Sequence, residues 1–109
     1  MRRDELEEFI GKIICLDLVN CERPVCRLLT VTDDYVVLKD PYIFVPVSVG
    51  NSMQVQAVSY AAPLFDVKKL QVSLDHIMAR LDVQPQMEQA YIRQTSSIVT
   101  ETKPSIIVP

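Results

Sequence analysis

Histidine and glycine are scarce in this sequence, and each shortage limits what the chain can be. Of 109 residues, 1 is His and 2 are Gly. A single imidazole, His76, without a Ser or Cys nucleophile in a recognisable motif does not make a catalytic set. We therefore expect neither an enzyme nor a bound cofactor. The two glycines, Gly11 and Gly50, fall where strand-like segments begin or turn.

The cysteines Cys15, Cys21 and Cys26 are odd in number, which excludes a fully paired disulfide framework. They lie in or beside apolar, strand-like segments, where a free thiol behaves as a small hydrophobic group. A zinc site needs about four Cys or His ligands, and His76 is far away in the sequence. We expect structural, reduced thiols, no metal site and a reducing compartment.

We expect no signal peptide, and the sequence has no long apolar run. Acidic residues follow Met1-Arg2-Arg3 at once, and no apolar run approaches the roughly 18 residues of a spanning helix. We expect a cytoplasmic protein with no membrane partner. Hydrophobic residues make up 49% and charged residues 23%, as in a globular protein. We assign one domain to residues 1–97 and a tail to residues 98–109.

Alternating and β-branched segments dominate the chain and predict an antiparallel meander. Gly50-Asn51-Ser52 is the strongest hairpin signal, and the strict alternation of residues 53–60 indicates one buried and one solvated face. Asp40-Pro41 predicts a bulge or bend, because Pro cannot donate to a ladder. The remaining strand-like segments comprise residues 12–19, 24–32, 35–39, 42–49, 70–74 and 77–83.

A helix is expected at each end of these strands. Residues 3–10 place Leu6 and Phe9 on one apolar stripe behind an acidic first turn. Pro85 opens a second helix from its favoured first position. Residues 61–66 contain Pro63 and are expected to form a loop.

The opening helix, Gly11-Lys12-Ile13-Ile14-Cys15-Leu16-Asp17-Leu18 and the segment from Leu29 to Leu38 resemble the first half of the Sm-like (LSm) family. Val72-Ser73-Leu74-Asp75-His76-Ile77 falls where the second motif of that family would lie. The layout is most similar to divergent Sm-like proteins of tailed bacteriophages. The resemblance implies an all-β, strongly bent, five-stranded antiparallel barrel with a helix at each end, in a homo-oligomer that forms a closed ring.

The resemblance also implies where a base would bind, and the sequence departs from the family there. In the family an aromatic, an Asn and an Arg-Gly pair hold a uridine. The aromatic is kept as Tyr35, whereas Val37, Ser73 and Leu74 stand at the other positions. Without the amide and the guanidinium, hydrogen bonds that select one base are not expected.

Four residues are candidates for nucleic-acid contacts, and each has a simpler interpretation. Tyr35 offers a face for base stacking, but it is also typical of a packing residue beside a turn. His76 is either a surface turn residue or a contact to nucleic acid or a neighbouring subunit. Lys68 and Lys69 contribute either to a basic patch with Arg80 and Arg93 or to a guard on an edge strand.

The acidic cluster Asp33-Asp34 with Asp40 does not match a calcium loop, and turn chemistry explains these residues better. Two functions remain open. The first is a ring-forming module that binds RNA or single-stranded nucleic acid weakly and without uridine specificity. The second is a structural or protein-interaction oligomer without nucleic-acid binding. The net charge of −3 favours the second, although it leaves room for a local basic patch.

Overall fold

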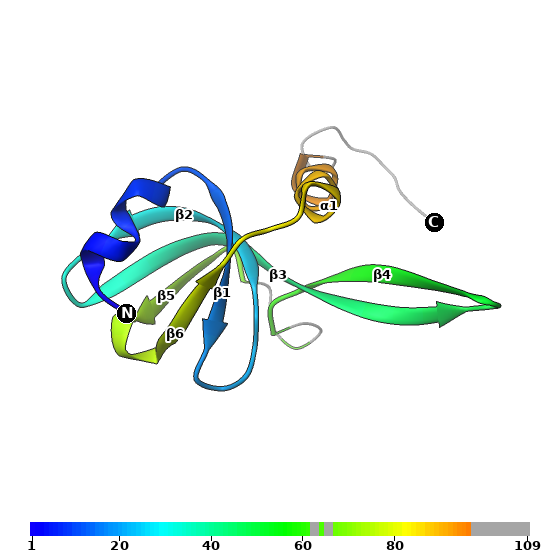
Figure 1. Ribbon diagram of the computed structural model, residues 1–109, viewed down its shortest axis with the longest axis horizontal. Coiled ribbons are helices and arrows are strands. Elements are labelled where there is room, and N and C mark those ends of the chain that lie inside the picture. Colours follow the sequence, from blue (N-terminus) through cyan, green and yellow to red (C-terminus); the bar gives the residue numbers. More distant parts are fainter. Residues whose placement is uncertain (62–63, 65–66, 97–109) are drawn as a thin grey trace.

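The computed structural model describes residues 1–61, 64 and 67–96 (Figure 1). The predicted tail and part of the loop expected at residues 61–66 lie outside the described residues. The strands are β1 (Ile13–Leu18), β2 (Val25–Val31), β3 (Tyr35–Val49), β4 (Ser52–Ser59), β5 (Lys69–Ser73) and β6 (Ile77–Leu81). The helical elements are η1 (Arg3–Glu5), η2 (Glu7–Phe9), η3 (Leu74–His76) and α1 (Pro85–Ser96).

The strands form one curled antiparallel sheet, which makes a half-barrel. The order is β4-β3-β2-β1-β6, and β5 also pairs with β3. β3 is long enough for two partners: residues 35–39 pair with β5, and residues 42–49 pair with β4. Because β4 and β5 run antiparallel to the same strand, they form two halves of one return path.

The core fills the concave side of this sheet. Its buried members alternate along the strands, as a one-sided sheet requires. Leu6, between η1 and η2, is completely buried and closes one end of the half-barrel. The core comprises Leu6, Ile14, Leu16, Leu18, Cys26, Leu28, Val31, Val36, Leu38, Val72, Leu74 and Ile77.

The expected bulge at Asp40-Pro41 is present, and it marks where β3 changes partners. Asp40 has φ 48°, in the left-handed region, and the β2–β3 register shifts there. α1 packs over this point. The hydroxyl of Tyr91 lies 3.0 Å from the carbonyl oxygen of Lys39 and 2.9 Å from that of Asp40. Its ring meets Tyr42 edge to face, with centroids 6.2 Å apart.

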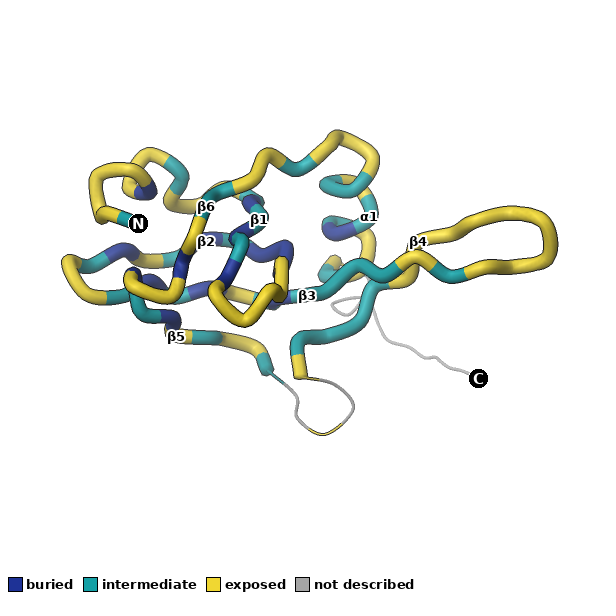
Figure 2. The backbone as a smooth tube through the Cα atoms, turned by 60° about the horizontal axis from the view of Figure 1, so that its bottom comes forward, coloured by how far each residue is buried: buried dark blue, intermediate teal, exposed yellow. Residues whose placement is uncertain are grey.

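Beyond the bulge, β3 and β4 project from the half-barrel as a two-stranded arm, residues 43–58 (Figure 1). The predicted hairpin turn is confirmed: Val49 pairs with Ser52, and Gly50 adopts φ 59°. Figure 2 shows that most of the arm is exposed, and none of its residues belongs to the core. The arm therefore has no second layer to pack on within the described chain.

The mostly β fold with terminal helical segments is confirmed, but four details differ from the prediction. Residues 53–60 have no buried face, because no core lies against either face of the arm. The described chain has six strands rather than five, because the return path of β3 is split into β4 and β5. The segment at residues 3–10 forms two 3₁₀ turns rather than one helix. The sheet curls without closing, since neither β5 nor β6 has a second partner strand among the described residues.

Candidate functional site

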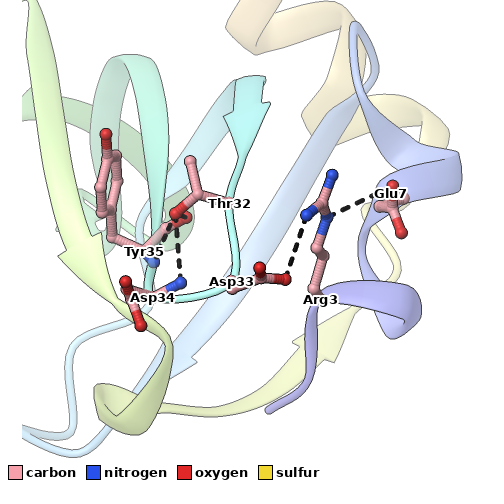
Figure 3. Close-up of polar contacts among 6 residues, drawn as sticks. All are labelled: Arg3, Glu7, Thr32, Asp33, Asp34 and Tyr35. Atoms are coloured by element: carbon pink, nitrogen blue, oxygen red, sulfur yellow. Dashed lines mark hydrogen bonds and ion pairs between the residues drawn. The ribbon is translucent and has the colours of Figure 1, made fainter.

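The β2–β3 turn and the N-terminal segment are tied together beside η3 (Figure 3). The Tyr35 N–H donates to the Thr32 hydroxyl at 3.0 Å, and the Thr32 N–H donates to the Tyr35 carbonyl at 2.8 Å. Arg3 bridges Asp33 at 3.0 Å and Glu7 at 3.5 Å. Turn chemistry and ion pairing thus account for this acidic turn.

The same turn is connected to η3 through the backbone. The Leu74 N–H donates to the Asp34 carbonyl at 2.9 Å, and the terminal ammonium of Met1 lies 3.1 Å from the Leu74 carbonyl. The hollow here is lined by acidic Asp33 and Asp75 as well as by Arg2 and Arg3. Phosphates would therefore meet charges of both signs at this position.

Tyr35 lies on the outer face of the sheet, half-buried, at the end of β3. It pairs with Ser73 of β5, and Val37 pairs with Gln71, so all four side chains share that face. Ser73 accepts a hydrogen bond from the Asp75 N–H at 3.3 Å and thereby caps η3. Leu74 is buried in the core instead. Of the positions that the resemblance associates with a base, Tyr35 and Ser73 are neighbours, and Leu74 faces away.

A row of cations crosses the outer face at the other end of these strands. Lys39 of β3 pairs with Lys69 of β5 on one side and with Arg27 of β2 on the other. Both lysines are exposed, and neither forms an ion pair with another described residue. Like charges placed directly opposite one another destabilise a strand pair. An anion bound across this row would relieve that repulsion.

The lysines selected from the sequence therefore contribute in part. Lys69 belongs to the row, whereas Lys68 is an exposed neighbour whose carbonyl accepts the Asp40 N–H at 2.8 Å. Sequence reasoning missed Lys39 and Arg27. Alternation along residues 35–39 was a usable signal for Lys39, because it places Tyr35, Val37 and Lys39 on one face. Nothing in the sequence indicated that Arg27 would be its neighbour.

The other two expected members of the basic patch lie elsewhere. Arg80 is on β6, where its guanidinium stacks on Phe9 at 3.9 Å and pairs with Asp82. Arg93 is on α1 and lines a hollow against the arm with Phe44 and Val55. Neither arginine lies on β2, β3 or β5, the strands that carry the row.

His76 is exposed in η3 and lines an open hollow of about 510 Å³ beside the edge of β5. Tyr60, Asn20, Gln71 and Ser73 also line it, and its floor is apolar. Burial raises the pKa of Tyr60 above its ordinary value, so the phenol stays neutral at physiological pH. The hollow offers amide, hydroxyl and imidazole groups but no nucleophile–base pair at bonding distance. Sequence reasoning also missed Tyr60 as a neighbour of His76. It treated Tyr60 only as the last residue of a strand, 16 positions before His76.

The position of each cysteine predicts burial for Cys15 and Cys26, in strands, and exposure for Cys21, in a turn, and the structure agrees fully for two of them. Cys26 is buried, Cys15 is half-buried and Cys21 is exposed in the turn, with φ 69°. None forms a disulfide. Burial raises the pKa of both Cys15 and Cys26, which keeps these thiols protonated. Among the described residues, no three metal-binding side chains come together.

Two strand edges remain open at the ends of the curled sheet. β5 pairs only with β3, and β6 pairs only with β1, within the described part of the chain. The β6 edge carries Met78, which is 66% exposed and sits at a register shift opposite Asp17 and Leu18. Unpaired backbone groups and an exposed methionine together form a surface suited to another strand.

None of the helices that the structure describes has both the length and the apolar character needed to cross a bilayer. Comparison with known proteins assigns no relative. No protein-family model matches the chain, and no curated protein matches it.

Proposed function

We propose that the protein is a homo-oligomeric, Sm-like assembly module whose subunits join head to tail through β5 and β6. The observation that carries this proposal is the uncovered edge at each end of the half-barrel. Adding the β5 edge of one copy to the β6 edge of the next satisfies both rows of backbone groups. Repetition of one heterologous contact with a fixed rotation gives a closed ring.

The experiment measures the molar mass by size-exclusion chromatography with light scattering. We expect several copies per particle at micromolar concentration. Met78→Glu places a charge on the β6 edge and should reduce the mass. The control is Thr30→Glu, which adds the same charge to an exposed position on β2, a strand paired on both sides. A monomeric wild type, or equal masses for both variants and wild type, would contradict assembly through these edges.

A second candidate function is weak binding of single-stranded nucleic acid on the outer face. The row Arg27, Lys39 and Lys69 supports it, with Tyr35 on the same face four residues before Lys39 in β3. Cations contact phosphates and an aromatic ring stacks on any base. The groups that would select uridine are absent from the corresponding positions, so the binding should not depend on sequence.

Fluorescence anisotropy with oligo-uridine and oligo-adenine at two salt concentrations tests this function. Tyr35→Ala should weaken binding to both alike, by the roughly 1–3 kcal/mol that stacking contributes per base. Lys39→Gln combined with Lys69→Gln should make the plot of log K against log salt concentration less steep. The slope should change by about 0.7 for each phosphate contact that is lost. Lys12→Gln is the control, because Lys12 lies 5.6 Å from the Phe9 ring centroid and is on none of the three strands that carry the row. Tight binding of oligo-uridine alone would overturn this proposal.

A further inference from the structure

The arm combines three properties that are unusual for an isolated hairpin in water: it has no charged residue, both its faces are apolar, and its outer edge is open. From residue 41 to residue 65 the sequence contains no Lys, Arg, Asp, Glu or His, although the chain has 11 basic and 14 acidic residues. Both faces of the arm are largely apolar. Its register places Phe44, Pro46, Val55 and Met53 on the face toward α1 and Ile43, Val45, Val47, Val49 and Val58 on the other.

The outer edge of β4 is also unprotected. β4 pairs with β3 alone among the described strands, and it has no Pro, no charge and no register shift. Each of these features makes pairing with another chain less favourable, and β4 carries none of them. A two-stranded ribbon without further strands is marginally stable at best in water. The arm thus has an edge at which another strand can pair, and such pairing would stabilise it.

The sequence of this edge is symmetric. Gln54 and Gln56 flank Val55, and Met53 and Ala57 flank them in turn. When β4 pairs antiparallel with a second β4 about a twofold axis at Val55, Val55 faces its own copy and Gln54 faces Gln56. Apolar side chains then meet on one face, and amide side chains able to hydrogen-bond meet on the other.

We infer that the arm binds the arm of a second copy, edge to edge, through antiparallel pairing of the two β4 strands centred on Val55. The product is a four-stranded sheet in the order β3-β4-β4-β3. A neutral surface favours this partner, because the remainder of the chain has a net charge of −3 and repels its copies, whereas the arms do not. The arm projects away from the half-barrel, so the two bodies lie at opposite ends of the joint sheet (Figure 1).

This contact is separate from the β5–β6 contact of the proposed function, and it joins two rings or two single subunits. An eight-residue strand is about 27 Å long. One edge of that length buries less than the roughly 800 Å² per partner of a standard interface. A single arm pair is therefore weak, and several pairs between two rings are strong through multivalency.

Cysteine cross-linking of the full chain tests the register. In a Cys21→Ser background, which removes the exposed thiol, Val55→Cys should form a disulfide dimer under mild oxidation, because the two copies of residue 55 face each other. Met53→Cys is the matched control. Its copies lie four positions apart along the strand, about 14 Å, and should not cross-link. Equal cross-linking of both variants, or none by Val55→Cys, would overturn the inference in favour of another occupant.

Light scattering then separates this contact from the ring. Val55→Lys adds a charge to the β4 edge and should halve the number of copies per particle, whether the wild type is a pair of rings or a simple dimer. Met78→Glu should instead lower the number of subunits that join through β5 and β6. It should leave the disulfide between two copies of Val55→Cys intact. If Val55→Lys leaves the mass of the wild type unchanged, the arm contact is wrong even where the ring is right.

Discussion

The half-barrel and the arm share the strand β3, but the two halves of that strand differ in their partner strands and in how deeply their side chains are buried. Before Asp40, β3 lies between β2 and β5 and buries Val36 and Leu38 completely. After Tyr42, which also pairs with Val25 of β2, it pairs only with β4, and no residue of the arm is fully buried. The half-barrel is stabilised by a core that its own sequence supplies. The arm has hydrogen-bonded strands without a second layer, so part of its stability must come from a partner.

Shortening one apolar side chain in each region should give the largest difference in stability between the half-barrel and the arm. Leu28 is fully buried, so Leu28→Ala should lower the free energy of unfolding by about 2–5 kcal/mol. Val47→Ala in the arm should cost less than about 1 kcal/mol, because no core surrounds it. Urea denaturation at one protein concentration, in the Val55→Lys background that removes arm pairing, measures both. Equal costs would mean that the arm belongs to the cooperative unit.

Alkaline pH should destabilise the half-barrel through two buried acids. Burial raises the pKa of Cys26 and of Tyr91, so both stay protonated in the folded chain. The unfolded chain releases these protons above about pH 9 for Cys and about pH 10 for Tyr. The free energy of unfolding should therefore be unaffected below pH 9 and fall above it, by up to about 1.4 kcal/mol per pH unit per group.

Two cysteine variants isolate one contribution to this slope. Cys26→Ala should flatten the fall that begins near pH 9, measured by urea denaturation across a pH series. Cys21→Ala is the matched control, because Cys21 is exposed in the folded chain. An identical slope for both variants would exclude Cys26 as its source.

The junction between the two regions should be sensitive to a single hydroxyl. Tyr91→Phe removes the donor that lies against the Lys39 and Asp40 carbonyls, and we expect a loss of about 1 kcal/mol. Tyr42→Phe is the matched control, because its ring packs against Tyr91 while its hydroxyl forms no hydrogen bond with another described residue. Thermal unfolding of the two variants should differ, and coincident curves would show that packing rather than hydrogen bonding anchors α1.

The smallest global effect is expected at the tip of the arm. Gly50 has φ 59° with open space around its Cα, so Gly50→Ala meets no clash and costs only the backbone strain of a left-handed residue, about 1–2 kcal/mol. Hydrogen exchange of the arm amides should accelerate, while global unfolding of the half-barrel should not change. Gly50→Asn should have a weaker effect, since Asn tolerates this conformation. A drop in the global free energy of unfolding would show that the tip of the arm and the core unfold as one cooperative unit.

Local chemistry made much of this fold predictable. The Gly50 turn, the bulge at Asp40-Pro41 and the break between β5 and β6 each follow from residues with restricted or unusual backbone preferences, which act within a few positions. The exposure of Cys21 relative to Cys26 also followed, because one lies in a turn and the other in an apolar strand. The helical segment at residues 3–10 was predicted, but its division into two 3₁₀ turns was not, since a segment that short has too few backbone hydrogen bonds to favour α over 3₁₀ geometry.

The sequence by itself determined the alternation, the turns and the absence of charge between residues 41 and 65, because these are properties of neighbouring residues. Only the tertiary structure decided that Arg27, Lys39 and Lys69 form one row, that β5 and β6 keep open edges, and that the arm projects from the body. Register across a sheet joins residues far apart in the chain. Their side-chain neighbours are therefore fixed by which strands pair and by where the bulges fall, and no local pattern encodes that choice.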